Sequence, residues 1–175
     1  LKRVTLELGG KSPNIVFADA DPSEAFTGSA NGVFWNQGEI CSAGTRVFVE
    51  RPVYDDAVNA FVDHAAKIVV GDPLEGSTEM GPLVSREQQE RVQGYIEIGM
   101  TEGRLAGQGS RPEDPRLAGG YFIAPTVFAD VDNRMRIAQD EIFGPVPCLI
   151  PFTDESDAVR IANDTPYGLS SYVWT

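Results

Sequence analysis

The stretch that decides the fold runs from residue 14 to residue 49 and reads NIVFADADPSEAFTGSANGVFWNQGEICSAGTRVFV. Its two ends, residues 14–17 and 46–49, are short apolar runs typical of strands. Asp21, Pro22 and Glu24 form a helix start, with a capping carboxylate, a first-turn proline and an acidic residue three positions after the cap. Apolar side chains then recur at helical spacing, at Phe26, Ala30, Val33 and Phe34. The stretch therefore predicts a strand, a helix that ends near residues 36–38, and a second strand.

The same alternation continues on both sides of this unit, which predicts the α/β class. We expect one helix with a core face at Val58, Phe61, Val62, Ala65 and Val69, closed by Gly71. A capping box at Ser85 predicts another helix that runs to about Gly103, and a short helix is expected to begin within residues 153–157. The expected extended segments are residues 4–8, 121–128, 146–152 and 172–174, and residues 107–120 read as a loop.

Composition limits the class of protein. The chain has 175 residues, enough for one domain, and a net charge of 14 − 26 = −12, which argues against nucleic-acid and anionic-membrane partners. No run of 18 apolar residues could span a membrane. The two cysteines form no disulfide framework, so a reducing, cytoplasmic setting is expected. With one histidine, neither a multi-histidine metal site nor a Ser-His-Asp triad is expected, and we predict no metal.

Two residues stand out as candidates for chemistry. Cys41 lies in a turn rich in glycine and small residues, where a thiol can be either an inert side chain or an exposed nucleophile. Glu7 lies on the polar face of the expected strand 4–8, beside Gly9 and Gly10, and read alone it is either a surface carboxylate or a base.

The remaining polar and titratable residues have structural interpretations. Lys11 is expected to be solvated, His64 to lie at a surface or boundary, and Cys148 to be an inert core thiol. Asn36 is expected to order the loop before Cys41.

Several motifs together resemble the aldehyde dehydrogenase family over essentially the whole chain. Residues 6–13 (LELGGKSP) resemble the glutamate motif of that family, and residues 36–41 (NQGEIC) resemble its cysteine motif. The separation of Glu7 and Cys41, 41 − 7 = 34 residues, is the one expected in the family. Residues 141–146 (EIFGPV) resemble the block whose glutamate binds the nicotinamide ribose. Further blocks in the expected order are residues 80–83, 120–127 and 163–169.

The resemblance implies a role for each motif. Cys41 would be the nucleophile that adds to an aldehyde, and Glu7 would be the general base that activates water to hydrolyse the resulting thioester. A base of this kind is expected to be buried beside apolar neighbours. Glu141 would bind the ribose of NAD or NADP with Phe143 packed nearby, and Leu8 and Gly9 would lie against the nicotinamide.

The resemblance also implies what lies outside the chain. Residues 1–175 would be a truncated aldehyde dehydrogenase catalytic domain, with a mostly parallel sheet flanked by helices. The dinucleotide-binding domain and the oxyanion asparagine would lie upstream, and an oligomerisation strand downstream. We therefore expect the isolated chain to be inactive, an apolar former interface to be exposed, and the full-length protein to be a homo-oligomer that acts on an aldehyde.

Two alternatives stay open. A coenzyme A-acylating relative often does not need the base, so the intact block around Glu7 favours hydrolysis. A binding or structural relative that has lost catalysis is the other alternative, and the presence of both Cys41 and Glu7 speaks against it.

Overall fold

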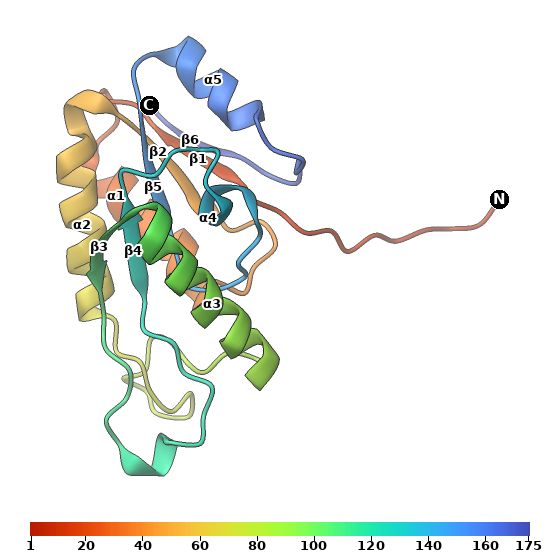
Figure 1. Cartoon of the computed structure of the whole chain (residues 1–175), viewed down its shortest axis with the longest axis vertical. Helices are drawn as coiled ribbons and strands as arrows, with labels where there is room; N and C mark the ends of the chain where they lie inside the picture. Colours follow the sequence, from red (N-terminus) through yellow and green to blue (C-terminus); the bar gives the residue numbers. More distant parts are fainter.

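The structure is a computed structural model that describes all residues, 1–175. Six strands form one sheet in the order β3-β4-β5-β2-β1-β6 (Figure 1). All neighbouring pairs are parallel except β3 and β4, which are antiparallel. The strands are β1 (Pro13–Val16), β2 (Arg46–Glu50), β3 (Arg104–Gln108), β4 (Thr126–Ala129), β5 (Cys148–Phe152) and β6 (Tyr172–Trp174).

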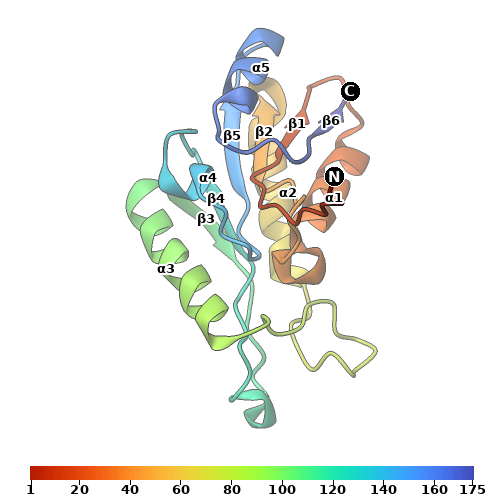
Figure 2. The same ribbon diagram turned by 90° about the vertical axis from the view of Figure 1, so that its right-hand side faces the viewer.

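Helices cover both faces of this sheet, as the α/β prediction requires (Figure 2). Helices α1 and α2 pack on one face, and α3 and α4 lie on the other. The helices are α1 (Pro22–Phe34), α2 (Tyr54–Lys67), α3 (Arg86–Glu102), α4 (Arg136–Gln139) and α5 (Glu155–Asn163), with short 3-10 turns η1 (Trp35–Gly38), η2 (Arg51–Val53) and η3 (Pro115–Leu117).

Successive residues of each central strand enter opposite cores, because side chains alternate across a sheet. In β2, Val47 and Val49 pack with α1 and α2, whereas Phe48 packs with α3, α4 and α5. In β5, Leu149 joins the first core and Ile150 the second. Strands buried on both faces explain why β2 and β5 read as continuous apolar runs in the sequence.

The helix starts read from the sequence are confirmed by hydrogen bonds. Asp21 Oδ1 accepts from the backbone N–H groups of Ser23 and Glu24, at 2.9 and 3.1 Å. Ser85 Oγ accepts from Gln88 N at 3.2 Å and begins α3. These side chains satisfy donors that the first turn of a helix cannot pair internally.

Three expectations about secondary structure are wrong. Residues 4–8 form no strand, because no strand of this chain lies beside them, and the segment extends away from the body (Figure 1). The expected loop at residues 107–120 begins inside β3, an exposed edge strand in which Gly107 and a shift of register after Leu105 hide the alternation. Helix α2 ends at Lys67, so Val69 is 47% exposed and is not a core residue.

One helix was not expected. The one-turn helix α4 has too few residues to show a period. No helix in the structure has the length and apolar character needed to cross a membrane.

The end of α2 makes a testable contrast. Phe61 is fully buried between α2 and the sheet, so Phe61→Ala is expected to lower the free energy of unfolding by about 3–5 kcal/mol. Val69 shares the helical spacing of Phe61 in the sequence but is exposed, and Val69→Ala is expected to change the free energy of unfolding by less than about 0.5 kcal/mol. Urea unfolding followed by circular dichroism measures both. Equal losses would mean that the helix and its core face continue to residue 69.

Candidate active site

Cys41 lies in the connection between η1 and β2 and is exposed. The chain reaches it through three successive residues with positive φ, Asn36 at 50°, Gln37 at 58° and Gly38 at 73°. Asn36 orders this turn, as the sequence suggested, since its Nδ2 donates to the carbonyl of Glu39 at 3.1 Å. A left-handed run of this kind is strained for residues with a Cβ, so the turn must be fixed by its surroundings.

A close backbone contact at Gly38 helps to fix the turn before Cys41. A Cβ built on Gly38 would overlap the backbone of Gly144, in the block that begins with Glu141. The cysteine turn and the Glu141 block therefore touch through two glycines with no side chain between them.

A second close contact joins the glutamate motif to both of these segments. A Cβ on Gly10 would overlap the carbonyl oxygen of Cys41, and a Cβ on Gly9 would overlap the carboxylate of Glu141. Gly10 N–H donates to Glu141 Oε1 at 3.0 Å across 131 residues of sequence. The structure thus brings Gly9, Gly10, Cys41 and Glu141 together, although they are far apart in the chain.

The other expected site residues, Glu7, Leu8 and Phe143, are exposed or only half-buried. Glu7 is exposed, so the expected burial beside apolar neighbours is wrong for this chain, in which residues 1–8 are all exposed. Leu8 is 56% exposed, as are Val4 and Leu6 on the same segment, at 74% and 68%. Phe143 is half-buried and has a positive φ of 60°.

The Glu141 block is held by two side chains of α3 that the sequence reading missed. Gln88 Nε2 donates to the carbonyls of Ile142 and Phe143, at 3.1 and 2.7 Å. Arg91 Nη2 donates to the carbonyl of Glu141 at 2.5 Å. Three consecutive carbonyls are therefore fixed by one helix face. The available signal was the spacing of Gln88 and Arg91, three residues apart and so on one side of α3.

Comparison with known proteins agrees with this geometry. The sequence model described as "Aldehyde dehydrogenase family" matches residues 1–175. The chain belongs to the aldehyde dehydrogenase family. It is 49% identical to the 5-carboxymethyl-2-hydroxymuconate semialdehyde dehydrogenase of Escherichia coli, over all of this chain and 38% of that protein.

Two solved aldehyde dehydrogenase structures share the fold. One is the betaine aldehyde dehydrogenase of Staphylococcus aureus in complex with NAD+, with a TM-score of 0.92 and 40% identity over 97% of this chain and 34% of that chain. The other is an aldehyde dehydrogenase C mutant of Pseudomonas syringae with NAD+ and octanal, with a TM-score of 0.92 and 43% identity over 99% of this chain and 36% of that chain. The chain thus spans little more than a third of the length of these aldehyde dehydrogenases.

One polar residue of the aldehyde dehydrogenase glutamate motif departs from expectation. Lys11 was expected to be solvated, but it is 1% exposed and its Nζ has no hydrogen-bond partner. The reason is that the chain turns inward at Gly10 and enters the sheet at β1 two residues after Lys11. Burial lowers the pKa of Lys11, because the charged form loses its hydration.

The two cysteines have opposite environments. Cys148 is fully buried in β5, and its thiol donates to the carbonyl of Ile137 at 3.2 Å. Burial raises the pKa of Cys148, since a thiolate there would be desolvated. The prediction of an inert core thiol is consistent with this position, and Cys41 is the exposed cysteine of the pair. His64 stacks on Phe34 at the boundary of the first core, as expected.

The contact at Gly38 predicts a specific loss of stability. Gly38→Ala adds a Cβ at positive φ and against the Gly144 backbone, so the free energy of unfolding is expected to fall by at least about 2 kcal/mol. Gly32 in α1 has no atom within 4 Å of its Cβ position, and Gly32→Ala is expected to raise it by up to about 1 kcal/mol. Urea denaturation compares the two. A neutral Gly38→Ala would show that the two segments do not touch in solution.

Proposed function

We propose that the protein containing this chain oxidises an aldehyde to a carboxylic acid with NAD or NADP as the hydride acceptor. The observation that carries this proposal is the meeting of the Cys41 backbone, Gly10 and the Glu141 carboxylate. Cys41 carries an exposed thiol, and Glu141 carries a carboxylate suited to bind hydroxyl groups. The names of the relatives support the same reaction class, and two of the solved structures are described as NAD+ complexes.

The residues present fit one half of a dinucleotide site. Glu141 Oε1 accepts the Gly10 N–H, while Oε2 lies against Gly9, so lone pairs remain to accept ribose hydroxyl groups. Glycine at both positions lets the main chain lie directly against the Glu141 carboxylate and the Cys41 carbonyl, which keeps the two motifs in contact. Phe143, half-buried after Glu141, provides an apolar surface. When bound, the cofactor would accept the hydride. The choice between NAD and NADP stays open.

In the proposed mechanism, Cys41 adds as a thiolate to the aldehyde carbonyl and forms a tetrahedral thiohemiacetal. The Cys41 N–H makes no hydrogen bond within the chain and is free to donate to the oxyanion. After oxidation, Cys41 carries a thioester. Glu7 then takes a proton from water, which attacks the thioester, expels the Cys41 thiolate and yields the acid.

We propose hydrolysis rather than transfer to coenzyme A. The chain retains the carboxylate that hydrolysis requires, in an intact block from Leu6 to Pro13. Because Glu7 and its neighbours are exposed here, we propose that the base becomes ordered in the whole protein and that the isolated chain does not turn over aldehyde.

The nucleophile and base are tested with p-nitrophenyl acetate, an ester that acylates reactive thiols without a cofactor. In the whole protein, acetylation mapped by mass spectrometry is expected at Cys41 and is lost in Cys41→Ala. Glu7→Gln is expected to slow deacetylation by about 10²–10⁴-fold, the usual contribution of a general base. Cys148→Ala is the matched control and is expected to acetylate at the parental rate. Labelling at Cys148, or none, would contradict the assignment.

The hydrogen bonds from α3 to the Glu141 block predict that a substitution in α3 weakens cofactor binding. Gln88→Leu removes two hydrogen bonds that hold Ile142 and Phe143, so KM for NAD is expected to rise about tenfold or more. Gln93→Leu is the control on the same helix, because Gln93 is exposed and bonds only weakly to Glu97. Steady-state kinetics of the whole protein measure both. An unchanged KM in Gln88→Leu would separate α3 from cofactor binding.

A further inference from the structure

We propose that Arg46 is a positioning residue, whose guanidinium holds the glutamate-motif segment in register against the Cys41 turn. The inference rests on the proposed function, because it assigns the register of Glu7 to a group that does not itself touch substrate. Arg46 is the first residue of β2 and directly follows the connection that contains Cys41.

The burial of Arg46 is unusual for a cation. Its side chain is fully buried, and no carboxylate lies within ion-pair distance. Burial lowers the pKa of Arg46 to about 10, so it still carries its charge at pH 7. A buried charge is tolerated only where its donors are satisfied, and here neutral oxygen atoms from several segments satisfy them.

The Nε donor of Arg46 bonds to the main chain of the glutamate motif. Arg46 Nε donates to the Lys11 carbonyl at 2.8 Å, and its backbone N–H donates to the Ser12 carbonyl at 3.4 Å. Lys11 directly follows Gly10, which lies against the Cys41 carbonyl. Residues 1–8 are exposed, so the contacts at Gly10 and Lys11 set where Glu7 can reach.

The two terminal nitrogen atoms of the guanidinium bond to Asn133 and to the end of α5. Nη1 donates to Asn133 Oδ1 at 2.9 Å and to the Ile161 carbonyl at 3.2 Å, and Nη2 donates to the Ala162 carbonyl at 2.9 Å. The two carbonyls lie in the last turn of α5, where a cation is favoured by the helix dipole.

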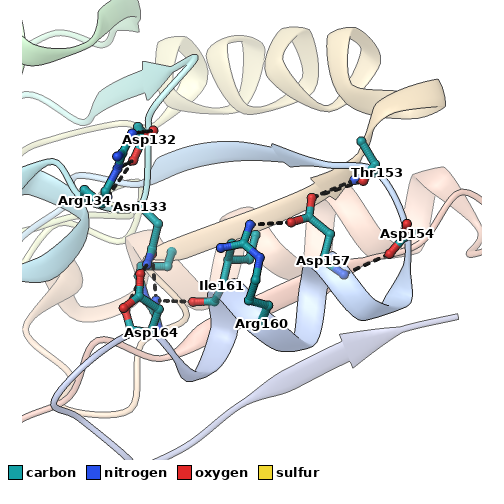
Figure 3. Close-up of polar contacts among 10 residues, drawn as sticks. Asp132, Asn133, Arg134, Thr153, Asp154, Asp157, Arg160, Ile161 and Asp164 are labelled. Carbon is teal, nitrogen blue, oxygen red and sulfur yellow. Dashed lines mark hydrogen bonds and ion pairs between the residues drawn. The ribbon is translucent and has the colours of Figure 1, made fainter.

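Asn133 is itself fixed, because its Nδ2 donates to the Asp164 backbone and side chain at 2.9 and 3.1 Å. Figure 3 shows Asn133 directed toward Asp164 beside the end of α5. The guanidinium also lies over the Phe48 ring, 5.2 Å from its centroid. The Nη1 and Nη2 contacts therefore fix the plane of the guanidinium, and its Nε donor then fixes the Lys11 carbonyl.

The geometry separates this role from general stabilisation. The α5 and Asn133 contacts contribute to the fold, whereas the Lys11 contact acts on the segment that joins the exposed residues 1–8 to β1, beside the bond from Gly10 to Glu141. Loosening it is expected to leave attack by Cys41 intact and to slow the step that needs Glu7. A lysine keeps the charge but cannot reproduce the planar fork.

The test follows p-nitrophenyl acetate hydrolysis by the whole protein with Arg46→Lys. The acylation burst is expected within about threefold of the parental rate, and deacylation is expected to slow by at least about tenfold, a modest part of a general base's contribution. Hydroxylamine, which attacks the thioester without a base, is expected to restore release. In a Glu7→Gln background, Arg46→Lys is expected to add no further loss.

Two controls keep the result interpretable. Phe61→Leu, in the core on the opposite face of the sheet, lowers stability without touching Arg46, and its deacylation is expected at the parental rate. Asn133→Ala keeps Arg46 but removes one of its acceptors, and a smaller slowing in the same direction is expected. It serves as the test if Arg46→Lys fails to fold.

The outcomes are distinct. Parental deacylation in Arg46→Lys and Asn133→Ala, or a loss that adds to that of Glu7→Gln, would overturn the role of Arg46 alone. Absence of acylation in the parent protein would overturn the proposed function and this inference together.

Discussion

The arrangement depends on the contact between the Gly10 backbone and the Cys41 carbonyl, with the Glu141 carboxylate bonded to the Gly10 N–H. A side chain at Gly10 would separate the glutamate motif from the cysteine turn. The same logic holds at Gly38 and Gly144, where a second pair of glycines allows two main chains to meet. Glycine is required at these positions for close approach, at some conformational cost to the folded chain.

The sheet explains why these segments meet. Strands β1 and β2 are adjacent and parallel, so the segments that enter them, at Lys11 and after Cys41, arrive at the same edge. Strand β5 lies on the other side of β2, and the Glu141 block leads into it. Three segments thus converge at the amino ends of three neighbouring strands. Hydrogen bonds from Gln88 of α3 to the Glu141 block and from the buried guanidinium of Arg46 to Lys11 then fix two of these segments.

The sequence predicted those parts of the fold that are fixed by local chemistry. The Asp21 and Ser85 caps act within one helical turn, and the apolar runs of β2 and β5 report burial on both faces. Residues 4–8 alternate like a strand but find no partner, since pairing depends on a neighbour that local sequence cannot supply. The burial of Lys11 follows from a hydrogen bond to Arg46, 35 residues away, and from that of its neighbour Gly10 to Glu141, and Gln88 reaches Ile142 across 54 residues; periodicity encodes none of these contacts. The motifs located Cys41 and Glu141, but their contact through Gly9, Gly10 and Gly38 emerged from the structure.

The most direct test of this convergence is a crystal structure of the whole protein bound to NAD. We expect ribose hydroxyl groups within hydrogen-bond distance of Glu141, the Cys41 thiol facing the nicotinamide, and the Gly10–Glu141 hydrogen bond retained. A cofactor bound away from Glu141, or a Gly10 segment displaced from the Cys41 turn, would contradict it.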